Sequence, residues 1–97
     1  MKVIYTDEAL RDLDEVLTFI DLKYPTVSRP FAQRLRAIER RIGRWPASAE
    51  EVEQRRGVRV VPVIQYPYKI FYQVTKEAVE ILHIHHAARQ EPWEGER

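Results

Sequence analysis

The stretch VRVVPVIQYPYKIFYQVTKEAVEILHIH, residues 58–85, decides the fold of this chain. It is rich in β-branched and aromatic residues, which favour strands. Turn-forming residues at 65–67 and 75–77 divide it, so we expect three strands, 58–63, 68–74 and 79–85, joined as a meander. Pro62 cannot donate a hydrogen bond to a neighbouring strand, so we expect it at a sheet edge or at a bulge.

The N-terminal half shows helical periodicity after one short strand at residues 2–5. Thr6 is a good N-cap, and the acidic residues that follow it lie in the first turn, where the helix dipole favours negative charge. From Ala9 to Tyr24 apolar residues recur at spacings of three and four. This pattern predicts an amphipathic helix of about five turns that ends at Pro25.

A second amphipathic helix, capped at Thr26 or Ser28, is expected to run as far as Gly43. Residues 48–51, Ser-Ala-Glu-Glu, have the spacing of a capping box, so we expect a short third helix there. The predicted order is β-α-α-(α)-β-β-β, which is an α+β fold. A helical hairpin packs on one face of a small, mostly antiparallel sheet, and the other face is left open.

Length and composition predict one intracellular domain. The 97 residues suffice for a single domain over residues 1–89, with a polar tail over residues 90–97. In that tail, Trp93 either docks on the domain or contacts a partner. The chain has no cysteine, which excludes disulfides, thiolate metal sites and a cysteine nucleophile. We see no signal peptide and no membrane-spanning stretch, so we expect a cytoplasmic protein without membrane contact.

The formal net charge of +1 hides two blocks of opposite sign. Residues 7–21 hold six acidic residues and one arginine, whereas residues 29–44 hold six arginines and one glutamate. The electrostatic field is therefore local and dipolar. Most arginines of the second helix lie opposite its apolar stripe, which is typical of a solvated face. The alternatives are phosphate binding and a basic helix that faces an acidic segment of a partner.

Several motifs resemble, in their order and spacing, those of the ParE/RelE superfamily of toxins from type II toxin–antitoxin systems. They extend over nearly the whole chain: Tyr5 before a capped helix, Tyr24-Pro25, Pro46, Gly57-Val58-Arg59, YPYKIFY at 66–72 and ILHIHHAAR at 81–89. The last two are the most specific. A strand with the pattern Tyr-x-Ile-x-Tyr, followed by a strand that ends in His-x-Ala-Arg, resembles the ParE-like branch.

The resemblance implies a toxin that a cognate antitoxin neutralises in a hetero-oligomer. ParE-like members are associated with poisoning DNA gyrase, and RelE-like members with cutting mRNA in the ribosome. Fold alone does not distinguish these activities. A third reading is a homologue that has lost toxicity and serves only in a regulatory complex. None of these readings implies a cofactor, a resident metal or sequence-specific DNA binding by this chain.

A ribonuclease would need a general base, a general acid and cations that stabilise the charge on the phosphate. The candidates for these roles are His85, His86, Arg89 and Arg59. RelE-like nucleases typically crowd several cations onto the open face, where this chain offers Arg59, Lys69 and Arg89. No tyrosine follows Tyr72. These departures favour a gyrase-binding toxin that is not itself an enzyme.

Alternation along the last strand predicts where its histidines lie. His83 and His85 should share a face with Val79 and Ile81, while Ile84 and its neighbours of the same parity share the other face. If the face of Ile84 packs on the helices, both histidines lie on the open face. Their spacing could chelate a metal, but no further ligand is evident nearby in the sequence. Each histidine could equally be a half-buried packing residue.

We therefore expect the target or antitoxin to bind where the sheet carries polar and cationic side chains, together with the C-terminal end of the chain. The residues of this predicted site are Arg59, Lys69, Tyr72, His85, His86, Arg89 and Trp93.

Overall fold

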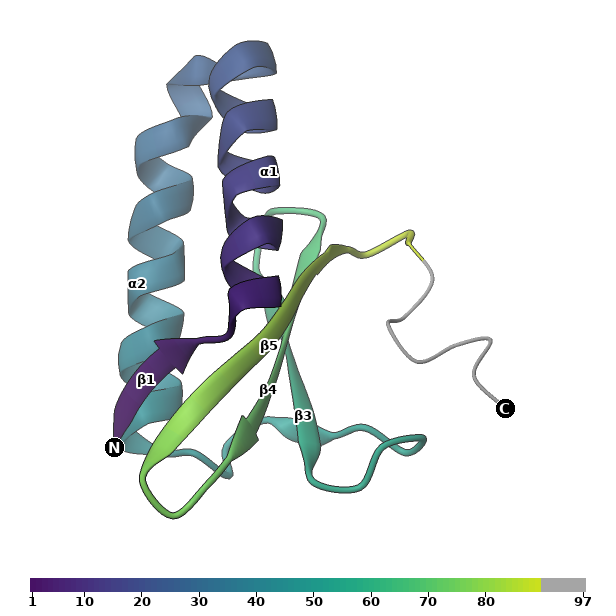
Figure 1. Cartoon of the computed structure of the whole chain (residues 1–97). Helices are drawn as coiled ribbons and strands as arrows, with labels where there is room; N and C mark the ends of the chain where they lie inside the picture. Colours follow the sequence, from purple (N-terminus) through teal and green to yellow (C-terminus); the bar gives the residue numbers. More distant parts are fainter. Residues whose placement is uncertain (90–97) are drawn as a thin grey trace.

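Two helices lie side by side against one face of a five-stranded sheet in the computed structural model, which describes residues 1–89 (Figure 1). The helical elements are α1 (Asp7–Lys23), the short 3-10 helix η1 (Pro25–Val27) and α2 (Ser28–Arg44). The strands are β1 (Lys2–Tyr5), β2 (Glu50–Glu51), β3 (Val58–Val63), β4 (Tyr68–Val74) and β5 (Ala78–His86). The predicted α+β fold, its helical hairpin and its C-terminal meander are confirmed.

The strands follow the order β1-β5-β4-β3-β2 across the sheet. β1 pairs with β5 in parallel, and every other pair is antiparallel. The first and last strands are therefore neighbours, and β5 has a partner on each side. Within the described residues, β2 pairs only with Arg59 and Val60 of β3. Pro62 thus lies where β3 is an edge strand, as its missing N–H predicts.

Helix α1 begins at the residue that the sequence indicated. The Thr6 side chain accepts a hydrogen bond of 3.1 Å from the Ala9 N–H, which satisfies one of the donors left free at a helix start. Asp7 and Glu8 lie in the first turn and Lys23 lies in the last turn. All three charges therefore interact favourably with the helix dipole. The helix ends one residue before Tyr24-Pro25, as predicted.

The start of α2 differs from the prediction. Neither Thr26 nor Ser28 caps it, because η1 runs directly into the helix and Val27 is the N-cap residue. The Ser28 hydroxyl instead donates to the Asp21 carboxylate at the end of α1. The preceding 3-10 turn already supplies helical backbone, and Ser28 binds the other helix of the hairpin.

The predicted third helix at residues 48–55 is wrong, because this segment forms the two-residue strand β2 and a turn. Glu51, read as the last residue of a capping box, accepts a hydrogen bond of 2.9 Å from the Gly57 N–H across that turn. Gly57 has φ 86°, a left-handed conformation that glycine adopts without steric cost. Tertiary pairing with β3 therefore prevails over the local helical signal.

The main core lies between the helices and one face of the sheet. Phe31 of α2 is fully buried, and its ring meets those of Tyr66 and Tyr68 edge to face at 5.2 and 5.6 Å. The other buried side chains of this core include Ala9, Val16, Ile20, Leu35, Ile38, Ile42, Val63, Ile70, Tyr72, Val79, Ile81 and Ile84. A smaller cluster lies on the opposite face, where Val58 and Val60 pack against the buried Val52 and Phe71.

A bulge in β5 changes which residues share a face. Tyr72 of β4 pairs with Ile81, but the next residue back, Phe71, pairs with His83, so Leu82 has no partner on β4. Thr6 binds the bulge, since its hydroxyl donates to the carbonyl oxygens of Ile81 at 3.1 Å and Leu82 at 3.4 Å.

The alternation along β5 therefore reverses at Leu82. Ile81 and Ile84 both face the helices, whereas His83 and His85 face the opposite side. The prediction that the histidines share a face with Val79 and Ile81 is wrong. Their placement on the face away from the helices is nevertheless correct, because the face of Ile84 packs on the helices.

No helix within residues 1–89 is long and apolar enough to cross a membrane. The predicted tail at 90–97, with Trp93, lies outside the described residues.

Candidate functional site

The residues of the predicted site occupy three different places in the structure. Arg59 and Tyr72 face the helices, Lys69 and His85 face the opposite side, and His86 and Arg89 lie at the C-terminal end of β5.

Arg59 and Tyr72 together hold the segment that connects α2 to β2. They are paired residues of β3 and β4. The Tyr72 hydroxyl donates to the Pro46 carbonyl at 2.7 Å, and the Arg59 guanidinium donates to the Ala49 carbonyl at 2.6 Å. Arg59 therefore lies on the helix side and not on the open face where the sequence analysis put it, and it is half-buried.

Tyr72 is fully buried in the main core. Burial raises the pKa of its phenol. Hydrogen bonding and the nearby Arg59 charge lower the pKa, but the effect of burial is larger. A partner cannot reach this side chain without local opening. In this conformation the contribution of Tyr72 is to the stability of the fold.

Lys69 and His85 are paired across β4 and β5 on the face away from the helices. The Lys69 ammonium lies 5.7 Å from the centre of the Phe71 ring, and the ring of the buried His85 meets Phe71 edge to face at 6.1 Å. This pair therefore surrounds the small apolar cluster of the second face. Arg59, at the other end of β3, is not part of it.

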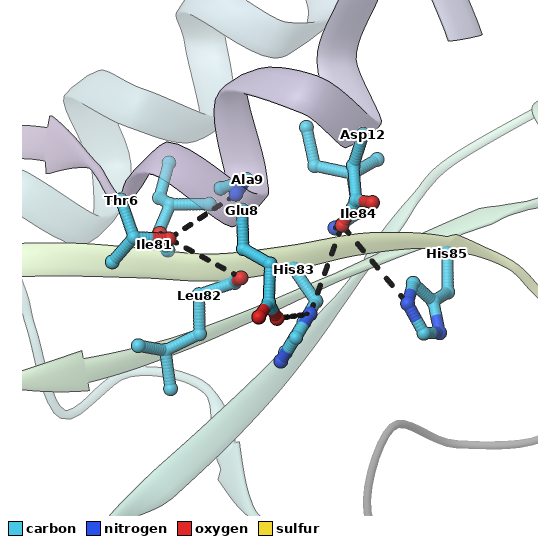
Figure 2. A network of polar contacts seen from close by, with 9 residues as sticks. All are labelled: Thr6, Glu8, Ala9, Asp12, Ile81, Leu82, His83, Ile84 and His85. Atoms are coloured by element: carbon cyan, nitrogen blue, oxygen red, sulfur yellow. Dashed lines mark hydrogen bonds and ion pairs between the residues drawn. The ribbon is translucent and has the colours of Figure 1, made fainter. Parts of the chain in front are cut away.

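Two carboxylates from α1 face the histidines of β5, as Figure 2 shows. Beyond Ile81, β1 no longer pairs with β5, and the first turns of α1 lie beside the exposed edge of the strand. Asp12 Oδ2 accepts a hydrogen bond of 3.0 Å from the Ile84 N–H. This contact satisfies a backbone donor at the sheet edge and fixes the orientation of the carboxylate.

The distances in this cluster are short. His83 Nδ1 lies 3.2 Å from Glu8 Oε2 and 3.7 Å from Asp12 Oδ2, and His85 Nε2 lies 4.0 Å from Asp12 Oδ2. Asp12, His83 and His85 each offer a metal-ligand atom within 4.8 Å of the others. The sequence shows no third ligand near the two histidines, whereas the fold brings one to them. Asp12 is distant in the sequence but adjacent in space.

This electrostatic environment bears on RNA chemistry. A phosphate that approached His83 or His85 would meet the negative charges of Glu8 and Asp12, which lie 3.2 to 4.0 Å from the imidazole nitrogens. A ribonuclease site needs the opposite charge to stabilise its transition state. Of the cations expected on this face, Arg59 instead binds a carbonyl group on the helix side, whereas Lys69 is paired with His85.

His86 and Arg89 are exposed at the C-terminal end of β5. The His86 ring stacks edge to face on Tyr68 at 5.5 Å, and its Nδ1 accepts a 3.1 Å hydrogen bond from the Ala88 N–H. Both residues line a cavity of about 180 Å³ that also includes Phe19 and Glu15 of α1. Cationic, aromatic and acidic groups thus meet in one concave surface, which we call the β5-end pocket.

A groove between α2 and the edge of β3 was missed by the sequence analysis. Two adjoining cavities of about 240 and 160 Å³ share Arg41, Val61 and Pro62. Arg34 and the exposed Ile64 extend the smaller cavity. We call this surface the α2–β3 groove. The positions of Arg34 and Arg41 beside the apolar stripe of α2 were the available signal in the sequence.

Comparisons with known proteins agree with this architecture. A family model described as "ParE toxin of type II toxin-antitoxin system, parDE" matches residues 3–91. A solved structure described as "Chromosomal ParDE TA system from P. aeruginosa" is similar, with a TM-score of 0.74 and 19% identity. The match covers 89% of this chain and 95% of that one. Among curated proteins, no sequence matches.

Proposed function

The chain belongs to the ParE family of toxins of type II toxin–antitoxin systems, and from this membership we propose that it inhibits DNA gyrase in the cytoplasm and is neutralised by a cognate antitoxin. The family match over residues 3–91 is the observation that carries the proposal. Gyrase is the target with which the ParE-like branch is associated.

The distribution of charge supports binding to a protein target over RNA cleavage. Two carboxylates of α1 lie 3.2 to 4.0 Å from the imidazoles of His83 and His85. The exposed polar groups of the β5-end pocket, His86 and Arg89, lie beside the apolar surface of Phe19. Aromatic and arginine side chains beside apolar surface are typical of protein–protein interfaces. We therefore place the gyrase contact at the β5-end pocket.

The α2–β3 groove fits an extended antitoxin segment. Its floor is apolar, and the edge of β3 beyond Val60 has no strand partner among the described residues. A strand-like segment could pair with that edge and place its side chains in the two cavities. Arg34 and Arg41 favour acidic residues in such a segment. We assign antitoxin neutralisation to this groove.

The experiment that tests the target is pulse-labelling after the chain is induced without its antitoxin, with DNA and protein synthesis followed separately. We expect DNA synthesis to stop first, and the purified chain to inhibit supercoiling by gyrase in vitro. Early loss of protein synthesis with gyrase unaffected would instead support a ribosome-dependent endoribonuclease. Normal growth after induction would support a non-toxic regulatory homologue.

Single substitutions test the surface. Arg89→Glu and His86→Ala should each weaken gyrase inhibition by at least about tenfold, because both side chains belong to the proposed contact. Arg36→Glu, on an exposed position of α2, is the control for the change of charge. If Arg36→Glu weakens inhibition as much as Arg89→Glu, the contact is not at the β5-end pocket.

A further inference from the structure

The cluster of His83, His85 and Asp12 has the composition of a metal site. Imidazole nitrogens and carboxylate oxygens are ligands that Zn²⁺ binds, and two histidines with one carboxylate are a common set of protein ligands for it. His83 and His85 come from β5 and Asp12 comes from α1. We propose that these three residues bind a single Zn²⁺ ion, which links α1 to the edge of β5.

The geometry favours a site that needs little rearrangement. Zn²⁺ bonds of about 2.0–2.2 Å in a tetrahedron place ligand atoms about 3.3 Å apart. Asp12 Oδ2 lies 3.7 Å from His83 Nδ1 and 4.0 Å from His85 Nε2, and all three ligand atoms lie within 4.8 Å of one another. Side-chain rotations alone, without movement of the backbone, would bring the three atoms to that spacing. The residues lie in well-defined elements and not in a loop.

The surroundings of the ligands resemble the outer shell of a metal site. The hydrogen bond from the Ile84 N–H orients the Asp12 carboxylate, as such bonds orient carboxylates that bind metals. Glu8, 3.2 Å from His83 Nδ1, can supply a fourth ligand from the helix side. The side chains of His83 and Glu8 are 21% and 60% exposed, so the ion can enter from solvent.

The bulge at Leu82 is what makes the site accessible to α1. In a regular strand with Leu82 paired to Phe71, His83 and His85 would share a face with Ile81 and point into the core between sheet and helices. With the bulge, both face the opposite side of the sheet, and the carboxylates of α1 reach them around the strand edge. The site therefore depends on the fold and is absent from the unfolded chain.

The test is a Zn²⁺ titration of the purified full chain without a polyhistidine tag, by calorimetry and by competition with a chromogenic chelator. We expect one ion per chain. His83→Ala, His85→Ala and Asp12→Asn should each weaken binding by at least about tenfold, and Glu8→Gln should weaken it less. His86→Ala is the matched control, because it removes the remaining histidine, which faces the helices. It should leave Zn²⁺ binding unchanged.

Substitution by Co²⁺ gives a second readout, since a tetrahedral site would produce visible absorption that His83→Ala abolishes and His86→Ala retains. His83 is partly exposed, so this variant decides the matter even if His85→Ala fails to fold. No binding to the folded wild-type chain would overturn the proposal. Equal binding by wild type and His83→Ala, or equal loss in His86→Ala, would overturn it as well. Neither readout uses toxicity, so the result is independent of the gyrase proposal.

Discussion

At the residue scale, two tyrosine hydroxyls join parts of the chain that are distant in sequence. Tyr5 of β1 donates to the Glu39 carboxylate of α2, and Tyr72 of β4 donates to the Pro46 carbonyl after α2. Both bonds fix the C-terminal half of α2 and the residues after it relative to the sheet. Tyr72, which the sequence placed in the predicted target site, therefore contributes to the stability of the fold in this conformation.

Tyr72→Phe should lower the free energy of unfolding by about 1 kcal/mol, because it removes the hydrogen bond to the partly buried Pro46 carbonyl and keeps the packing of the ring. Urea denaturation followed by circular dichroism would measure the change. Gyrase inhibition at a temperature where the variant is folded should match wild type. A large loss of inhibition without loss of stability would show that Tyr72 contacts the target.

Alkaline pH should destabilise the protein. Burial, the hydrogen bond to Glu39 and the Glu39 charge, in that order, raise the pKa of Tyr5 above its ordinary value of about 10. Burial also raises the pKa of Tyr68. Above about pH 10 the unfolded state loses these phenolic protons while the folded state keeps them, so stability is present below that pH and is lost as pH rises.

The urea midpoint should therefore fall between about pH 8 and pH 11, and the fall should be smaller in Tyr5→Phe than in wild type. Tyr24→Phe, on an exposed tyrosine, is the control for loss of a phenol. An equal fall in Tyr5→Phe and wild type would contradict the role given to Tyr5.

At the scale of elements, the sequence predicted the helices, strands and helix cap that are determined by residues close together in the chain. The cap at Thr6, the apolar spacing of α1 and α2 and the strands of the meander are local signals, and all were read correctly. The segment 48–55 was misread because its capping-box spacing is local, whereas the pairing of Glu50 with Val60 is not. Pairing across the chain leaves no mark in a short window of sequence.

The candidate site was predictable only in part, for the same reason. The histidines of β5 were found because histidine stands out in an apolar strand. Asp12 was hidden among the acidic residues of α1, and nothing in the sequence indicates that it meets His83 and His85. The bulge at Leu82 also has no local signature, so alternation assigned the wrong neighbours to both histidines.

Gly43→Ala should destabilise the protein although alanine favours helices by about 1 kcal/mol over glycine. A Cβ at Gly43 would lie 2.9 Å from the Met1 carbonyl oxygen and 3.1 Å from Val3 Cγ2. Backbone atoms of β1 cannot move away without loss of the hydrogen bond from the Met1 amino group to the Gly43 carbonyl. We expect a net loss of about 1–2 kcal/mol in urea denaturation. A gain in stability would mean that Met1 and Val3 shift to make room for the added methyl group.

At the scale of the whole molecule, the opposite charges of the two helices make the surface electrostatically asymmetric. The acidic residues of α1 lie beside the β5-end pocket, while Arg34 and Arg41 of α2 line the α2–β3 groove. Two partners of different charge could therefore bind different sides of the same small domain. The net charge of +1 contains none of this information.

Charge reversal at the groove should weaken antitoxin binding. We expect Arg34→Glu and Arg41→Glu each to raise the dissociation constant by about tenfold, with a smaller effect at high salt because salt screens partly exposed charges. Calorimetry with the purified antitoxin at two salt concentrations would measure both effects. Arg36→Glu is again the control. Unchanged affinity in both groove variants would show that the antitoxin does not bind in the α2–β3 groove.

The position of β5 between β1 and β4 has a consequence for how the toxin is made. A nascent chain that has not reached Ala78 lacks the strand that joins its first strand to the rest of the sheet. Chain elongation at about 5–20 residues per second leaves several seconds in which the helices exist without that strand. Products that stop before Ala78 thus lack the β5-end pocket and two of the three proposed zinc ligands, His83 and His85, so they cannot make the proposed contact with gyrase.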